Sequence, residues 1–139
     1  MAVIQLLVMP EERRPDFADV FSAASASDIP FKPEEVDLVT HTGFLPVEVE
    51  GLATGFEYYF DEIESGALPD EAMRFGSHQM ISRTGGDMAE MLASLLFFRA
   101  SAKLSGAAYV YPDDAIIIPP NEVDRYLTDQ ITMLRKYLK

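Results

Sequence analysis

The pattern of hydrophobic and polar positions predicts one long buried helix. Residues 84–105, TGGDMAEMLASLLFFRASAKLS, form the longest apolar segment of the chain. Large apolar residues recur at mixed three- and four-residue spacings, and alanines fill many of the remaining positions. A helix that is apolar nearly all round is typical of a protein core. We expect Thr84 to be its N-cap, with Asp87 completing a capping box, and Gly106 to end it.

A second pattern, strict alternation over residues 44–61, predicts a β-hairpin. In residues 44–50 two valines alternate with two glutamates, and in residues 56–61 aromatic residues at even positions alternate with polar ones. Residues 51–55 are the predicted turn. Because alternate side chains point to opposite faces of a strand, pairing the two strands collects the polar positions on one face. That face is predicted to carry Glu48, Glu50, Glu57, Tyr59 and Asp61.

Shorter patterns complete the predicted fold. Strands are expected at 2–8, 36–40 and 77–83, a second hairpin at 107–118, helices at 15–26 and 122–138, the latter capped by Asn121, and loops at 31–35 and 65–75. The strands come in hairpin-spaced runs rather than in strict βαβ alternation. We therefore expect an α+β fold, with a mostly antiparallel sheet packed against the buried central helix and an amphipathic C-terminal helix. The length fits one α+β domain over residues 1–139.

The charge is strongly negative and unevenly distributed. The formal net charge is −12, and residues 31–71 hold eleven acids against one base, Lys32. Nucleic acids and anionic membranes are bound through Lys and Arg, so neither is an expected partner. The acidic stretch is interpreted either as a solvated surface or as a site for a basic partner, with a cation site as a third reading.

The chain contains no cysteine, which excludes a disulfide framework, a thiol nucleophile and a zinc–thiolate site. This composition is compatible with the reducing cytoplasm, where we expect the protein. The apolar N-terminal run lacks a preceding basic region and a small-residue cleavage site. It is therefore interpreted as a first strand rather than a signal peptide.

No residue pattern predicts a catalytic, cofactor or metal site. His41 and His78 are far apart in the sequence and show no metal-ligand spacing. The turn Thr84-Gly85-Gly86 is followed by an aspartate, whereas a phosphate-binding loop needs a lysine there. Glu48 and Glu57 would need one buried member to work as an acid–base pair. We therefore predict no catalytic residues, no cofactor and no metal.

Several short motifs resemble a known group of proteins. The residues are TGFEYY at 54–59, a GGD-x-x-E helix start at 85–90, an Ala-rich helix, SGAAY at 105–109 and a Tyr-Pro-Asp-Asp turn at 111–114. Together, over roughly residues 44–118, they resemble small acidic bacterial proteins that include toxin-immunity proteins of contact-dependent or secreted-effector systems. The resemblance implies binding and neutralising a cognate toxin, and it carries over no catalytic residue.

Three functions are left open by the sequence. The first is a non-catalytic immunity protein whose acidic face, Glu48, Glu50, Glu57, Tyr59 and Asp61, binds a basic toxin. The second is a small metal-dependent hydrolase or other enzyme, which predicts a concave pocket with at least two carboxylates and His41 or His78. The third is a structural or assembly subunit, such as a homodimer joined through an exposed apolar edge. Both a monomer and a homodimer remain possible oligomeric states.

Overall fold

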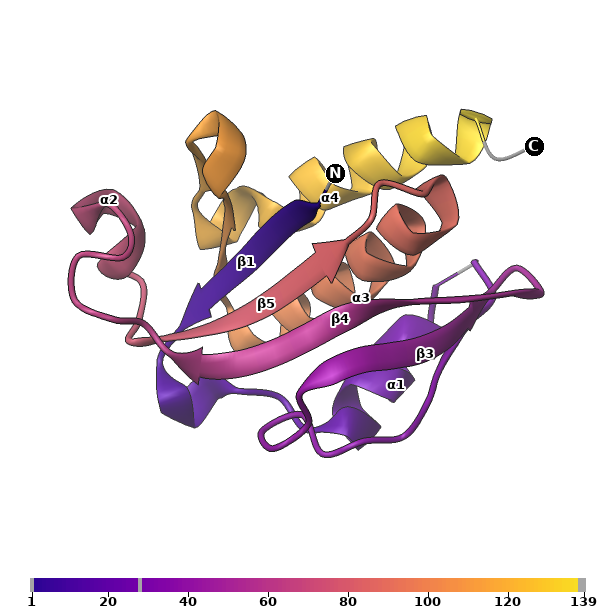
Figure 1. Cartoon of the computed structure of the whole chain (residues 1–139), viewed down its shortest axis with the longest axis horizontal. Helices are drawn as coiled ribbons and strands as arrows, with labels where there is room; N and C mark the ends of the chain where they lie inside the picture. The colour runs from indigo at the N-terminus through magenta and orange to yellow at the C-terminus, as the bar shows by residue number, and fades with distance from the viewer. Residues whose placement is uncertain (1, 28, 138–139) are drawn as a thin grey trace.

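The computed structural model describes residues 2–27 and 29–137 and shows an α+β fold around one antiparallel sheet of seven strands (Figure 1). The strand order is β2-β3-β4-β5-β1-β6-β7. The strands are β1 Val3–Met9, β2 Phe31–Pro33, β3 Gly43–Val49, β4 Leu52–Glu62, β5 His78–Thr84, β6 Ala108–Tyr111 and β7 Ile116–Ile118. The helices are α1 Phe17–Ser25, α2 Asp70–Met73, α3 Met88–Ser105 and α4 Pro120–Tyr137, with 3-10 turns η1 Glu11–Arg13 and η2 Pro112–Asp114. The predicted fold class is confirmed.

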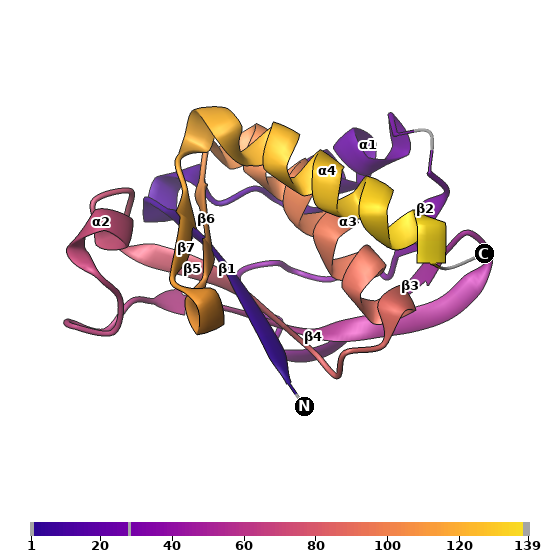
Figure 2. The same cartoon turned by 90° about the horizontal axis from the view of Figure 1, so that it is seen from above.

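The three longer helices lie on the same face of the sheet. Figure 1 shows α1, α3 and α4 behind the strands, with α3 crossing the middle of the sheet, and the view from above in Figure 2 shows the three helices together on one side, with α4 packed against α3. Among the residues that the structure describes, the other face is covered only at one end, where the segment containing α2 packs Ala72 and Phe75 against strand residues such as Leu6 and Val110. We call the uncovered side of β3, β4 and β5 the open face.

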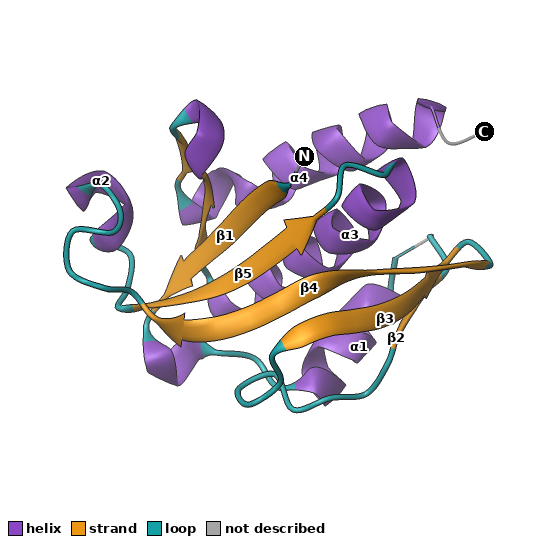
Figure 3. Cartoon of the chain, in the orientation of Figure 1, coloured by secondary structure: helices purple, strands orange, loops and turns teal. Residues whose placement is uncertain are grey.

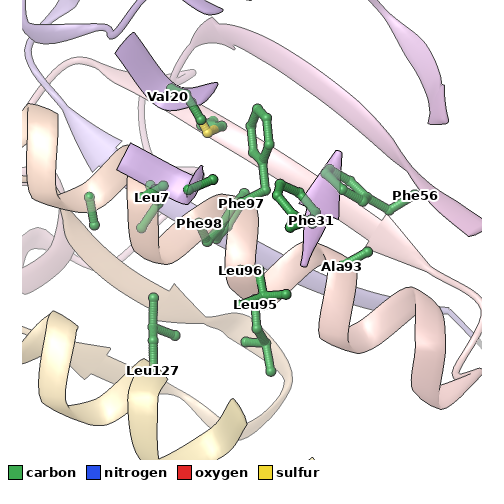
Figure 4. Packing of buried hydrophobic residues seen from close by; sticks show 14 of the residues in the cluster. Leu7, Val20, Phe31, Phe56, Ala93, Leu95, Leu96, Phe97, Phe98 and Leu127 are labelled. Carbon is green, nitrogen blue, oxygen red and sulfur yellow. The ribbon is translucent and has the colours of Figure 1, made fainter. Parts of the chain in front are cut away.

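The central helix is buried, as predicted, but it begins later than predicted. Phe97 and Phe98 are fully buried, and Figure 4 shows them packed among residues from α1, the strands and α4. The N-cap is Asp87, whose Oδ1 accepts hydrogen bonds from the amides of residues 89 and 90. Thr84 continues β5 and pairs with Val3, so its backbone is extended and it cannot cap the helix. Gly106 ends α3 in the left-handed conformation, as predicted.

Other differences from the prediction have local causes. Glu50 and Gly51, both with positive φ, make a two-residue turn, so β4 starts at Leu52 and runs through the predicted turn. Residues 36–40 form a turn fixed by Asp37, whose Oδ1 accepts the amides of residues 39 and 40.

Three further element boundaries also differ. The predicted loop at 31–35 contains edge strand β2, and the loop at 65–75 contains α2. The last helix starts at Pro120, whose fixed φ suits a first turn, so Asn121 lies inside the helix rather than capping it. Its predicted extension to Leu138 lies outside the described residues.

Candidate interaction surface

The open face is built by alternate residues of three neighbouring strands. Pairing between β3 and β4 places Phe44 beside Glu57, and pairing between β4 and β5 places Arg83 on the other side of Glu57. The same alternation puts the following side chains on this face: Phe44, Pro46, Glu48, Ala53, Glu57, Tyr59, Asp61, Gln79, Ile81 and Arg83. Residues of opposite parity, including Leu45, Phe56 and Tyr58, are buried under the helices.

Four of the five predicted site residues share the open face, and one does not. Glu48, Glu57, Tyr59 and Asp61 lie on it, as the alternation predicts. Glu50 does not, which corrects the prediction. It lies beyond the last residue of β3 in a left-handed turn conformation, and its carboxylate binds Arg135 of α4.

The acidic residues follow the hairpin as a line rather than a cluster. Glu48 is paired with Ala53 of β4, which lies eight residues before Asp61 on the same strand. At about 3.4 Å per residue these two ends are about 27 Å apart. The open face therefore presents separated charges suited to an extended contact with a partner, and it does not concentrate several carboxylates at one point.

Most of these acids have local partners. One oxygen of Glu57 accepts a hydrogen bond from the Tyr59 hydroxyl at 2.6 Å, and the other lies 3.8 Å from Arg83 Nη1. The hydrogen bond to Glu57 is the main cause that raises the pKa of Tyr59 above its ordinary value of 10.0. Asp61 Oδ1 accepts a hydrogen bond from the Gln79 amide at 3.1 Å. These bonds hold the carboxylates in fixed positions on the strand.

The open face also carries exposed apolar side chains that the sequence reasoning did not assign to a site. Phe44 is 56% exposed, Ile4 of β1 is 38% exposed, and Ile81 is partly exposed. The Phe44 ring lies directly over Gly55 of β4, where the absence of a side chain makes room for it. The alternating pattern could have placed Phe44 on this face, because Phe44 lies an even number of residues from Glu48 in the same strand.

A hollow lies at one end of the sheet, around His78. It has a volume of about 250 Å³ and is lined by Glu11, Arg14, Val39, Phe60, Asp61, Glu62 and His78. The His78 ring stacks on Phe60, its Nε2 lies 3.0 Å from a Glu11 carboxylate oxygen, and its Nδ1 lies 2.9 Å from Ser77 Oγ. The predicted enzyme pocket, with a histidine and at least two carboxylates, therefore has a counterpart here.

The two histidines are not brought together, and no metal centre is formed by the residues that the structure describes. His41 lies 3.1 Å from the Phe44 carbonyl oxygen through its Nε2 and does not line the hollow around His78. Within residues 2–27 and 29–137, no three His, Cys, Asp or Glu side chains are placed to hold a metal ion.

Comparison with protein-family models, with curated proteins and with solved structures finds no match for this chain. Among the helices in the described ranges, none combines the length and the apolar character needed to cross a membrane.

Proposed function

We propose that this protein is a non-catalytic binding protein of the immunity type, which acts in the bacterial cytoplasm and neutralises a basic cognate toxin held on its open face. One observation carries the proposal. The sheet face that α1, α3 and α4 leave uncovered presents Phe44 and Tyr59 among Glu48, Glu57 and Asp61. An apolar or aromatic anchor beside fixed charges is the usual composition of a protein-binding surface.

The charge of the molecule favours a basic partner. A net charge of −12 attracts a cationic protein over several ångströms and speeds the encounter between the two. Specific contacts then depend on the open face, where Glu57 and Asp61 are already held by Tyr59 and Gln79. A partner meeting side chains that are already ordered loses less conformational entropy when it binds.

The test uses the protein encoded by the gene adjacent to that of this chain. Co-expression of the two proteins is expected to protect cells from the neighbour's toxicity, and the purified pair is expected to form a one-to-one complex. The triple variant Glu48→Lys, Glu57→Lys, Asp61→Lys is expected to weaken the complex at least a hundredfold, because three attractions become repulsions. A matched control, Glu35→Lys, Asp113→Lys, Asp129→Lys, makes the same charge change at exposed positions away from the open face.

Equal affinity of both triple variants would reject the open face as the binding site. A neighbouring protein that neither harms cells nor binds the chain would reject the immunity function. Circular dichroism and urea unfolding of both variants separate loss of binding from loss of folding.

The hollow around His78 supports a second candidate function, hydrolysis. Ser77 Oγ, His78 and Glu11 are linked at 2.9 and 3.0 Å, the order of nucleophile, base and orienting carboxylate in hydrolytic triads. In this reading His78 Nδ1 takes the proton of Ser77 as the hydroxyl oxygen attacks the ester carbon, and the alcohol leaves with that proton. Water then hydrolyses the acyl-serine and releases the acid, while Glu11 accepts a hydrogen bond from Nε2–H throughout. Turnover of p-nitrophenyl acetate that disappears in both Ser77→Ala and His78→Ala would support it, and equal turnover in the parent and both variants would reject it.

A further inference from the structure

About half of β4 extends past the part of the strand that pairs with β5. β4 is 11 residues long, but β5 pairs only with residues from Glu57 to Glu62. Within the described part of the chain, no strand pairs with residues 52–56 on that side, which we call the free edge. Figure 3 shows the β3–β4 hairpin extending past the end of β5.

The hairpin geometry identifies which backbone groups point outward at the free edge. A two-residue turn makes Val49 and Leu52 a hydrogen-bonded pair, and such pairs alternate along an antiparallel ladder. Thr54 and Phe56 therefore bond to β3, while the N–H and C=O groups of Ala53 and Gly55 point away from it. The position of Pro46 agrees, because it lies opposite Gly55 at a site where β3 needs no N–H donor.

The start of α3 keeps the free edge open. After Thr84 the chain turns away through Gly86, whose φ is +95°, and the Glu90 carboxylate accepts a hydrogen bond from the Gly85 amide at 2.8 Å. A hollow of about 610 Å³ remains between this turn and the free edge. Its lining includes two exposed apolar side chains, two acids and the free edge itself: Phe44, Leu52, Ala53, Gly55, Asp87 and Glu90.

We infer that an extended basic segment of the protein partner adds to the sheet as a strand along the free edge, next to Ala53 and Gly55. The inference rests on the proposed function and names how that partner is held. Unpaired strand edges bind peptides through main-chain hydrogen bonds, while pockets beside the edge select alternate side chains. On the open-face side the segment meets Phe44, and on the helix side it meets Leu52 together with Asp87 and Glu90, which provide sites for Lys or Arg.

Charge favours a basic partner over a second copy of this chain. Two copies paired edge to edge would bring Asp87 and Glu90 of each close to those of the other, and each copy carries a net charge of −12. Like charges at such a contact oppose association. A segment with alternating Lys and apolar residues instead neutralises the two acids on the helix side and covers Phe44 on the open face.

The first measurement uses the free protein. Amide hydrogen exchange followed by nuclear magnetic resonance is expected to be at least tenfold faster at Ala53 and Gly55 than at Thr54 and Phe56, because only the latter two donate to β3. Similar protection at all four amides in the monomer would overturn the inference, because the edge would already be satisfied. Protection that appears only as a dimer forms would assign the edge to a second copy and overturn it as well.

The second measurement adds a defined probe, the capped peptide KVKVKVK. Its binding is expected to slow exchange at Ala53 and Gly55 at least tenfold. A fully N-methylated version with the same side chains is expected to bind at least tenfold more weakly, because it cannot donate to the edge. The peptide EVEVEVE controls for apolar contact and is expected to bind still more weakly. No binding of KVKVKVK at millimolar concentration would overturn the inference.

A protein variant separates edge addition from docking on the open face. Ala53→Pro removes an outward N–H without removing a bond to β3, and it is expected to weaken peptide binding at least tenfold while urea unfolding verifies the fold. The peptide affinity could instead be unchanged by both N-methylation and Ala53→Pro, with chemical-shift changes confined to Tyr59 and Arg83. That result would overturn edge addition and leave the proposed function standing. The open face fails separately as the toxin-binding site, when the charge-reversed triple variant binds the cognate toxin as well as the parent does, and the immunity function fails when the neighbouring protein neither harms cells nor binds the chain.

Discussion

Arg135 of α4 donates a hydrogen bond from Nε to a carboxylate oxygen of Glu50 at 2.9 Å, and its Nη2 lies 2.8 Å from the same oxygen in an ion pair. The bond joins the turn of the β3–β4 hairpin to the last helix, across 85 positions of sequence. It also explains why Glu50 does not contribute to the open face. The carboxylate that sequence alternation assigned to partner binding instead fixes the position of the hairpin tip.

A double-mutant cycle is expected to detect this contact. Glu50→Gln, Arg135→Gln and the double variant should give a coupling free energy of about 0.5–1 kcal/mol, because both side chains are about one-third exposed and water screens the pair. Urea unfolding at low and high salt measures it, and the coupling should fall with salt. The more exposed pair Arg125–Glu122, at 3.5 Å, is the control and should couple more weakly. Zero coupling at low salt for Glu50 and Arg135 would contradict the structural role.

Two buried serines of α3 are expected to respond oppositely to replacement by alanine. Ser94 is hydrogen-bonded to Ser82 of β5 and donates to Gln5 Oε1 of β1 at 3.1 Å, so it links the helix to the sheet. Removing the Ser94 hydroxyl leaves the buried polar groups of Ser82 and Gln5 without this hydrogen-bond partner. Ser94→Ala should therefore lower the free energy of unfolding by about 1–3 kcal/mol.

Ser101 is the matched control, because it is equally buried and its hydroxyl has no hydrogen-bond partner within the described residues. Ser101→Ala should be neutral or stabilise by up to about 1 kcal/mol, since it removes an unsatisfied polar group. Urea unfolding of both variants measures the change in the free energy of unfolding relative to the parent. Equal destabilisation by the two substitutions would show that the network around Ser94 contributes nothing.

The fold was predictable because it depends on patterns within single segments, and the site was less so because it depends on contacts between segments. The apolar run of α3 and the alternation of β3 and β4 each report burial directly, so both appear in the structure. The observed N-cap is Asp87 rather than the predicted Thr84, because pairing with Val3 extends β5 by one residue to Thr84. The Glu50–Arg135 bond and the free edge depend on where α4 lies and where β5 ends, and no local pattern encodes either.

Gly55 is expected to tolerate no side chain. A Cβ built on it lies 2.6 Å from the Leu45 carbonyl oxygen and 2.8 Å from Phe44 Cε1. Gly55→Ala should therefore lower the free energy of unfolding by about 1–3 kcal/mol, through displacement of the ring and of the β3 backbone. Adding Phe44→Ala should recover only part of this loss, because the backbone carbonyl remains in place. Thermal unfolding of the three variants measures the effect, and full recovery in the double variant would show that β3 does not resist the side chain.

Tyr58 is expected to make stability fall at alkaline pH. The side chain is fully buried, its hydroxyl donates to the Leu38 carbonyl, and burial, assisted by the charge of Asp37, raises its pKa well above 10.0. Between 10.0 and the higher folded pKa, the unfolded chain loses the phenolic proton and the folded chain keeps it. Tyr58 therefore costs no stability below pH 10 and up to about 1.4 kcal/mol per pH unit above it.

Urea unfolding between pH 8 and pH 11.5 measures the slope. Tyr58→Phe should lower stability by about 1 kcal/mol at pH 8, because the hydrogen bond to Leu38 is lost, yet it should flatten the decline above pH 10. Burial also raises the pKa of Tyr109, so Tyr109→Phe should likewise flatten the decline above pH 10. Ser101→Ala adds and removes no titrating group, so it should keep the parent slope. A Tyr58→Phe variant that declines as steeply as the parent would mean that the phenol is reached by water in the folded protein.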